Sequence, residues 1–256
     1  MIKVSIIVVS HNRPEMLKQA IDSCINQTLH DIEIIVIDDG STNEEVFKVI
    51  NIAVKQDSRI KFYKTTEEIN NLSIVWNLGI DIANGAFITT LDDDNMKLPE
   101  FCEKMVNALE SNPEYSAAAC YMQCLRNNKL AETFDGPAKM NRNNILKKNY
   151  VDSGSMMYRR ELFEKIGYFD EKLDSAEDWD FVKRIVFETE KGLLVVSEIL
   201  MIYRWHKRQR TNRKRGTDKD KMNKNYIVNE KIYGKKCNLN RKNSNLKLIY
   251  INNKPV

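Results

Sequence analysis

The chain has 256 residues, of which 42% are hydrophobic and 30% charged, and its formal net charge is +4. These values are ordinary for a water-soluble globular protein. No apolar run approaches the length that crosses a bilayer, and the N-terminal segment is too short for a signal peptide. We therefore predict a cytoplasmic protein. Five cysteines lie mostly in apolar segments and are predicted to be reduced core thiols, because they lack the pairings of a zinc site.

The first hundred residues alternate between predicted strands and helices. The first helix is expected to be capped by Asn12, with Pro14 in its first turn. Continuous apolar runs predict strands over 4–9, 32–37, 60–63 and 86–91, and apolar stripes predict helices from residue 12, from residue 43 and over 72–83. Strands that alternate with helices at this spacing indicate a mostly parallel, doubly wound sheet.

The pattern changes after Pro99. We predict a helix there, strands over 115–123 and 151–158, a short helix over 160–166 that ends at Gly167, and a longer helix from about Ser175. The last predicted strands cover 193–196 and 199–203, with a polar excursion between 123 and 151. From residue 216 onward Asn and Lys dominate, and this stretch is expected to be peripheral.

Two aspartate clusters follow strands. Asp38 and Asp39 end the run IEIIVID, and Asp92, Asp93 and Asp94 end GAFITTL. Ligands of open α/β sheets collect outside the carboxyl ends of strands. Carboxylates there can hold a divalent cation, which can hold a phosphate and relieves the repulsion between neighbouring aspartates. The alternative for the second cluster is a charged turn that caps the next helix.

Six segments occur in an order and spacing that resemble the family 2 glycosyltransferases with a GT-A-type fold. They are SIIVVSHNRPEMLKQAIDSCINQT, EIIVIDDGST, NLGIDIANGAFITTLDDDN, SGSMMYRRELFEKIGYFDE, EDWDFVKRI and YRWH. The resemblance covers roughly residues 3–210. The layout is similar to that of spore-coat polysaccharide synthesis glycosyltransferases. The resemblance implies an α/β fold with a mostly parallel sheet and a smaller mixed sheet. It implies a nucleotide-sugar-binding half (1–98), an acceptor-binding and catalytic half of the same domain (99–215), and a basic extension (216–256).

The resemblance assigns the nucleotide of a sugar donor to the first cluster. Asp39 would hydrogen-bond the base, and Asp38 would support the same pocket. The base and ribose would be lined by Val9, Ser10 and His11. His11 stands where the family commonly has a larger aromatic residue, and an imidazole can still stack on a base, although less extensively.

The resemblance assigns binding of the ribose and of the metal to the second cluster. Asp93 would contact the ribose, Asp94 would bind Mn²⁺ or Mg²⁺ that bridges the diphosphate, and Asp92 would support the donor site next to them. The cation would stabilise the charge that builds on the leaving group. In the family a histidine at the place of His206 often faces the diphosphate or the metal, and Arg204 is expected to assist. An isolated histidine at a strand end is otherwise a packing or surface residue.

Two asparagines also match donor-side positions of the family. They are Asn71 and Asn77, in the segment NNLSIVWNLG. The residue before the second asparagine is commonly Arg in the family and is Trp76 here, which removes a cation from the phosphate contacts. We expect Trp76 to lie in the core or in the pocket wall.

The predicted catalytic base is Asp178, in AEDWD, where the family has its ED pair. It would take the proton of the acceptor hydroxyl, and Glu177 would support the acceptor. The alternative is a capping box from Ser175 to Asp178 that opens a helix. Small residues on the strand over 151–158 would leave room for the acceptor sugar, or would only pack the sheet: Ser153, Gly154 and Ser155.

The basic stretch from Arg204, RWHKRQRTNRKRGTDKDKMNK, allows several roles. It could be a solvated tail, a lid in which Lys207, Arg208 and Arg210 cover the phosphates, or a contact with an anionic lipid-linked acceptor at the inner face of the membrane. No nucleic acid is expected, because a nucleic-acid-binding module would need recognition helices or aromatic platforms among the basic residues.

The predicted function is an inverting, metal-dependent hexosyltransferase that uses a UDP- or dTDP-linked sugar. Its acceptor would be a hydroxyl of a glycan or of a lipid-linked saccharide, in cell-surface polysaccharide synthesis. The alternative is a non-catalytic or Mg²⁺-binding α/β domain of the phosphoryl-transfer or receiver type. A sugar nucleotidyltransferase is disfavoured, because SHNRPEM lacks the glycines of its phosphate loop.

Overall fold

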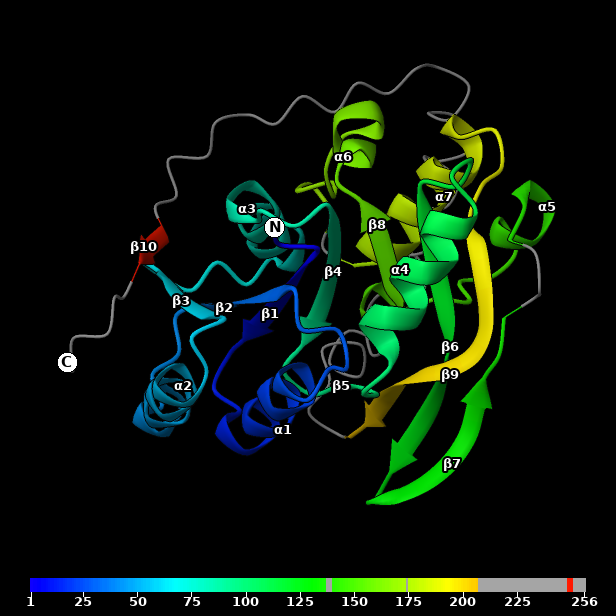
Figure 1. Ribbon diagram of the computed structural model, residues 1–256. Helices are drawn as coiled ribbons and strands as arrows, with labels where there is room; N and C mark the ends of the chain where they lie inside the picture. The colour runs from blue at the N-terminus through cyan, green and yellow to red at the C-terminus, as the bar shows by residue number, and fades with distance from the viewer. Residues whose placement is uncertain (137–139, 174, 207–247, 251–256) are drawn as a thin grey trace.

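A four-stranded parallel sheet forms the N-terminal half of the protein (Figure 1). The computed structural model describes residues 1–136, 140–173, 175–206 and 248–250. The parallel strands lie in the order β3, β2, β1, β4, and their bounds are β1 (Val4–Ser10), β2 (Ile32–Asp38), β3 (Ile60–Thr65) and β4 (Phe87–Asp92). The helices between them are α1 (Pro14–Ile25), α2 (Glu44–Gln56) and α3 (Leu72–Ile82).

Both faces of this sheet are buried, which explains the unbroken apolar runs of β1 and β2. Successive residues of a strand point to opposite faces, so Ile6 packs with α1 and α2, whereas Ile7 packs with α3. The core is thus two apolar layers that sandwich the sheet. The mostly parallel, doubly wound arrangement predicted for this half is confirmed.

The second half continues the same sheet with mixed strand directions. Beyond β4 lie β8 (Met156–Arg159), β6 (Ala117–Arg126), β9 (Leu194–Trp205) and β5 (Met96–Lys97). Only the β6–β9 pair is parallel here, and the pairs β4–β8, β6–β8 and β5–β9 are antiparallel. The helices of this half are α4 (Phe101–Ser111), α5 (Arg142–Ile145), α6 (Glu161–Ile166) and α7 (Glu177–Glu188).

The observed strands differ from the predicted ones in several places. The polar excursion contains β7 (Lys129–Phe134), an exposed strand that pairs with β6 across a turn at Asn127 and Asn128, both with positive φ as tight hairpin turns require. The segment 151–158 begins with a 3₁₀ turn, η1 (Ser153–Ser155), before β8. β9 is one long strand rather than two, and β10 (Leu248–Tyr250) adds an antiparallel strand to β3 at the sheet edge.

Two predicted helix caps are absent. The N-cap residue of α1 is Arg13, and Asn12 instead accepts hydrogen bonds from the backbone N–H groups of Thr42 and Asn43, both at 2.9 Å. The N-cap of α7 is Ala176, in the left-handed region at φ 60°, without a side-chain cap. The capping-box alternative for Asp178 is therefore wrong, which leaves that carboxylate available for another role.

The cysteines behave as predicted where the structure describes them. Four are buried free thiols: Cys24, Cys102, Cys120 and Cys124. Burial raises the pKa of the first three to about 12, so these thiols are protonated. Cys237 lies outside the described residues. Within the described ranges, no helix is both long enough and apolar enough to cross a membrane.

Candidate functional site

The first aspartate pair lies at the carboxyl end of β2. Asp38 is buried, and its Oδ2 accepts a hydrogen bond from the backbone N–H of Ser41 at 2.9 Å. Among the described residues, no group bonds its other oxygen. Burial raises the pKa of this carboxyl group above its ordinary value. Asp38 therefore supports the turn after β2, and its predicted role in the nucleotide pocket stays a prediction.

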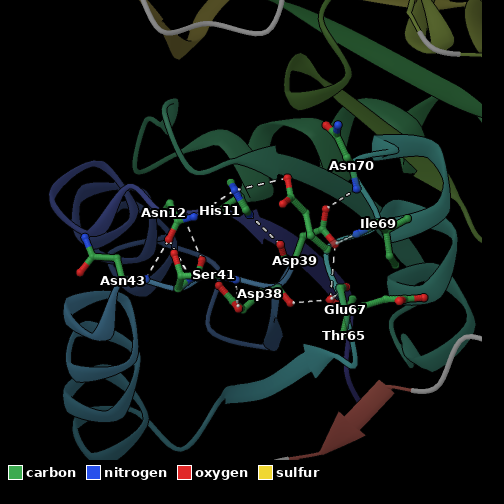
Figure 2. Close-up of polar contacts among 12 residues, drawn as sticks. His11, Asn12, Asp38, Asp39, Ser41, Asn43, Thr65, Glu67, Ile69 and Asn70 are labelled. Atoms are coloured by element: carbon green, nitrogen blue, oxygen red, sulfur yellow. Dashed lines mark hydrogen bonds and ion pairs between the residues drawn. The ribbon is translucent and has the colours of Figure 1, made fainter.

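Asp39 holds the loop that leads from β3 into α3 (Figure 2). Its Oδ1 accepts from the backbone N–H of Ile69 at 2.8 Å, and its Oδ2 accepts from that of Asn70 at 3.0 Å. Gly40 has φ +66°, and a Cβ there would lie 2.6 Å from the backbone nitrogen of Glu68, so only glycine lets the loop approach this closely. Oδ1 also lies 3.4 Å from the hydroxyl of Thr65, and contact of Asp39 with a base stays a prediction.

The imidazole of His11 is fixed between the ends of β1 and β2 (Figure 2). Its Nδ1 lies 2.7 Å from the carbonyl oxygen of Asp39, and its Nε2 lies 3.0 Å from Nδ2 of Asn12. Because Oδ1 of Asn12 accepts two backbone N–H groups, its Nδ2 must be the donor to Nε2. His11 therefore carries its proton on Nδ1. Val9 and Ser10 precede it as buried residues at the end of β1.

The second aspartate cluster contacts one guanidinium and one imidazole. Asp93 is fully buried, and its Oδ2 accepts from the backbone N–H of His11 at 3.0 Å. Asp94 Oδ2 accepts from Nη1 of Arg13 at 2.5 Å and lies 3.1 Å from Nε2 of His206. A buried oxygen of Asp92, Oδ1, has no partner among the described residues. The site thus combines a cluster of carboxylates with unmet capacity for positive charge.

The ionisation of this cluster is uneven. Burial raises the pKa of Asp93 to about 7, although Arg13 opposes that rise. Asp94 also loses solvent, yet the hydrogen bond from His206 and the charge of Arg13 bring its pKa below the ordinary value. Asp92 is raised well above its ordinary pKa, first by burial and then by the charge of Asp94. Asp94 is therefore the carboxylate of the three that is most readily charged.

β9 brings the distant residues Arg204 and His206 to the end of β4. The backbone N–H of Arg204 donates to Oδ1 of Asn95 at 2.9 Å, and its guanidinium donates to Gln19 at 2.5 Å. His206 and Asp94 are separated by 112 residues in sequence yet are hydrogen-bonded. The predicted convergence of His206 and Asp94 is therefore observed, whereas Arg204 is held against α1.

A divalent cation at this place would have two protein ligands and would be completed by the bound donor. In the described part of the chain, no group of three or more His, Cys, Asp or Glu side chains could hold a metal by itself. Asp94 and His206 would supply an oxygen and a nitrogen. Mg²⁺ is commonly held by one or two carboxylates, with substrate phosphates and waters filling the remaining positions. The donor set thus fits a cation that is completed by a diphosphate.

The predicted base, Asp178, lies in the first turn of α7 and is partly buried. Its Oδ1 accepts from the backbone N–H of Trp179 at 2.6 Å, and its Oδ2 accepts from Nδ2 of Asn149 at 3.2 Å. Burial, followed by the charges of Glu177 and Asp152, raises its pKa to about 7. A carboxylate with this pKa can take up a proton near neutral pH.

Asp152 is a site residue that sequence reasoning missed. Its Oδ1 accepts from the backbone N–H of Gly154 at 2.9 Å and so caps η1. Burial and the charges of Asp94 and Glu177 raise its pKa to about 6. Asp152 therefore lies close enough to interact electrostatically with both Asp94 and Glu177. The Asp-Ser-Gly-Ser segment was a turn signal, which the strand prediction over 151–158 obscured.

The three small residues after Asp152 form a turn rather than a strand. Ser153, Gly154 and Ser155 are buried. A Cβ on Gly154 would lie 2.8 Å from Cε of Met201, and its carbonyl accepts from the buried ammonium of Lys97 at 2.5 Å. The space beside Gly154 is filled by Met201, and Gly154 and Ser155 both donate hydrogen bonds to Asp152. Contact of these residues with an acceptor sugar stays a prediction. Glu177, the other predicted acceptor residue, is a buried neighbour of Asp178.

The two predicted donor-side asparagines support the segment before α7. Asn77 is buried, donates to the carbonyl of Phe169 at 2.9 Å and to Glu171 at 3.0 Å, and accepts from the N–H of Phe169 at 3.1 Å. Asn71 caps α3 and donates to the carbonyl of Glu171. Trp76 is buried against Phe169, as expected of a core residue. These contacts favour a packing role over a donor contact.

The predicted lid residues Lys207, Arg208 and Arg210 fall outside the described residues. The same holds for the basic extension, apart from β10.

The family model for glycosyl transferase family 2 matches residues 5–167. The chain belongs to this family. Among curated relatives, it is 29% identical to an uncharacterized glycosyltransferase of Methanocaldococcus jannaschii over 78% of this chain and 70% of the relative. It is 33% identical to the GalNAc(5)-diNAcBac-PP-undecaprenol beta-1,3-glucosyltransferase of Campylobacter jejuni, over 58% of this chain and 47% of the relative.

Solved structures show which fold this glycosyltransferase has. It superposes on S. aureus TarS 1-349 in complex with UDP-GlcNAc with a TM-score of 0.68, at 19% identity over 81% of this chain and 60% of that one. The mannosyltransferase PcManGT of Pyrobaculum calidifontis, in complex with GDP-Man and Mn²⁺, gives a TM-score of 0.62, at 18% identity over 80% and 58%. The fold is of the GT-A type, as predicted. The chain spans about three fifths of these structures' length.

Proposed function

We propose that this glycosyltransferase transfers a sugar from a nucleotide diphosphate to a hydroxyl acceptor with inversion, and that a divalent cation assists. The observation that carries the proposal is a series of three carboxylates that interact electrostatically. Asp94 is hydrogen-bonded to His206, Asp152 lies between, and Asp178 has a pKa of about 7. Asp94 is suited to bind a cation with a diphosphate, and Asp178 is suited to accept a proton.

The donor end would use Asp39 and His11 beside the base, Asp93 beside the ribose, and Asp94 with His206 at the metal. A Mn²⁺ or Mg²⁺ ion at this place would stabilise the negative charge that develops on the leaving diphosphate. Two neighbours support this assignment, since TarS was solved with UDP-GlcNAc and PcManGT with GDP-Man and Mn²⁺.

The acceptor end would use Asp178 as the general base. Inversion requires the acceptor hydroxyl to attack the anomeric carbon from the face opposite the diphosphate, and its proton must leave during the attack. Asp178 comes from α7, in the other half of the chain from Asp94, and its raised pKa suits it to accept that proton at neutral pH. Asp152 and Glu177 would hold the acceptor hydroxyls between the two ends.

The acceptor is proposed to be a glycan or a lipid-linked saccharide of the cell surface. The name of the Campylobacter jejuni relative describes a saccharide on undecaprenol diphosphate, which supports the lipid-linked class. The family match covers the strands that end in both aspartate clusters, which argues against a phosphoryl-transfer or receiver domain.

A thermal-shift panel tests the donor assignment. Binding to the folded state raises its melting temperature by mass action. We expect UDP, dTDP or GDP to raise the Tm with Mn²⁺, and the shift to shrink when EDTA replaces the metal. The corresponding nucleosides serve as controls without phosphates. A Tm that no nucleotide diphosphate raises, with or without metal, would contradict the proposal.

A further inference from the structure

Arg13 occupies an unusual position at the start of α1. The residue before it, Asn12, has φ 54°, in the left-handed region, and its backbone N–H donates to Oγ of Ser41 at 2.8 Å. Asn12 Oδ1 also accepts from the backbone N–H of Thr42. A non-glycine residue in this region needs such support. The turn therefore fixes the direction in which the chain presents Arg13.

The side chain of Arg13 bridges the two aspartates predicted to serve the ribose and the metal. Nη2 lies 2.8 Å from Oδ1 of Asp93, and Nη1 donates to Oδ2 of Asp94 at 2.5 Å. The side chain of Asp93 is fully buried and that of Asp94 is 10% exposed, whereas that of Arg13 is 28% exposed. The guanidinium thus offsets part of the negative charge of the cluster, and the side chain of Arg13 stays partly exposed to solvent.

The contact with Asp94 competes with the proposed metal. The oxygen that accepts from Arg13, Oδ2 of Asp94, is also the oxygen that faces Nε2 of His206. A cation bound between Asp94 and His206 would lie on the side of this oxygen, and the positive guanidinium would repel it there. A bound metal would therefore displace Nη1 of Arg13, while Nη2 could stay on Asp93.

We propose that Arg13 exchanges partners during the catalytic cycle. In the ligand-free protein it is the counter-ion of Asp94, and in the loaded protein its freed Nη1 binds the donor's diphosphate beside the metal. This inference rests on the proposed function. A guanidinium suits the second role because its fork of N–H donors matches phosphate oxygens.

The competing explanation is a permanent structural ion pair, in which Arg13 only stabilises the folded acidic cluster. The two explanations differ in sign for metal binding. A competitor that is removed frees Asp94 and strengthens metal binding, whereas loss of a structural partner disorders Asp94 and weakens it. They also differ for the diphosphate, which a purely structural Arg13 would not contact.

The test measures two affinities on Arg13→Gln, Arg13→Lys and the control Lys18→Gln. Lys18 is an exposed residue of the same helix that pairs with Asp22, so its substitution makes the same change of charge away from the cluster. Mn²⁺ affinity is measured on nucleotide-free protein from the spin-resonance signal of free Mn²⁺. UDP and GDP affinities are measured by calorimetry at saturating Mn²⁺. Circular dichroism confirms that each variant is folded.

For Arg13→Gln we expect Mn²⁺ to bind several-fold more tightly, and the nucleotide diphosphate about tenfold more weakly, as for loss of one charge-assisted hydrogen bond. Arg13→Lys, which keeps the charge, should lie between, and Lys18→Gln should match the wild type. A Mn²⁺ affinity that does not rise, or a nucleotide affinity that does not fall, would overturn the exchange. Wild-type protein that binds neither Mn²⁺ nor a nucleotide diphosphate would overturn the proposed function as well.

Discussion

The two halves of the sheet prepare their polar residues in different ways. In the N-terminal half, which we propose binds the donor (the donor half), Asp39 is fixed by the backbone N–H groups of the loop after β3. In the C-terminal half, which we propose binds the acceptor (the acceptor half), Asp152 and Asp178 lie at the starts of η1 and α7, and burial raises their pKa values to about 6 and 7. Under the proposed function, the first arrangement suits fixed recognition and the second suits movement of a proton.

This difference assigns separate tasks to the two halves. Residues of the donor half should control binding, and those of the acceptor half should control turnover with little effect on binding. A variant that changes donor affinity and turnover to the same extent would contradict this division.

The largest effect is expected for Asp178→Asn. The amide keeps the size of the side chain but cannot accept the acceptor's proton, so turnover should fall about a thousandfold, within the usual range for loss of a general base. Donor affinity should stay within about twofold of wild type, because in our account Asp178 makes no donor contact. Release of the nucleotide diphosphate from the donor measures turnover.

The control for this variant is Glu188→Gln, an exposed residue at the end of the same helix. It should turn over at the wild-type rate. An Asp178→Asn variant as active as this control would show that the carboxylate is not the base.

A smaller effect is expected from pH. Because burial raises the pKa of Asp178 to about 7, its base form is scarce at pH 6 and dominant at pH 8. Turnover limited by this group should therefore rise by about tenfold between these values. The pH profile of kcat/KM measures this, and a profile that is flat from pH 6 to 8 would be inconsistent with Asp178 as the base. The charges of Glu177 and Asp152 raise the pKa of Asp178 further.

The smallest effect on function is expected for Asn77→Ala. This substitution removes the amide that bonds both the N–H and the carbonyl of Phe169. Unmet buried groups cost about 1–3 kcal/mol each, so the Tm should fall by about 5–10 °C, while donor affinity at a temperature where the protein is folded should not change. The exposed Asn51→Ala serves as a control. A loss of donor affinity with an unchanged Tm would instead indicate that Asn77 contacts the donor.

The sequence predicted the donor half well because its signals are local. A run such as IEIIVID predicts both the strand and the position of the aspartates at its end, and the structure places Asp38 and Asp39 there. The contacts of Arg13 could not be predicted, because they join residues 81 positions apart through the pairing of β1 and β4. Asp152 was missed because a turn of three buried residues resembles a strand in its apolar surroundings.

The asparagines predicted to lie beside the donor show that a matching sequence position does not settle how a side chain is used. Asn77 matches the position of a donor-site residue in the family, yet its amide is used by the segment 169–171. Sequence position alone cannot distinguish these uses, since hydrogen bonding to a distant backbone carbonyl leaves no local pattern. The same holds for His11, whose tautomer is decided by the amide of Asn12.

Calorimetric titration of UDP and GDP with Mn²⁺ into wild type, Asp94→Ala and Asp178→Asn tests the central claim most directly. The account predicts that Asp94→Ala weakens metal-dependent nucleotide binding about a hundredfold, and that Asp178→Asn binds as the wild type does. Wild-type affinity in Asp94→Ala, or an equal loss in both variants, would contradict the division between a donor-binding half and a catalytic half.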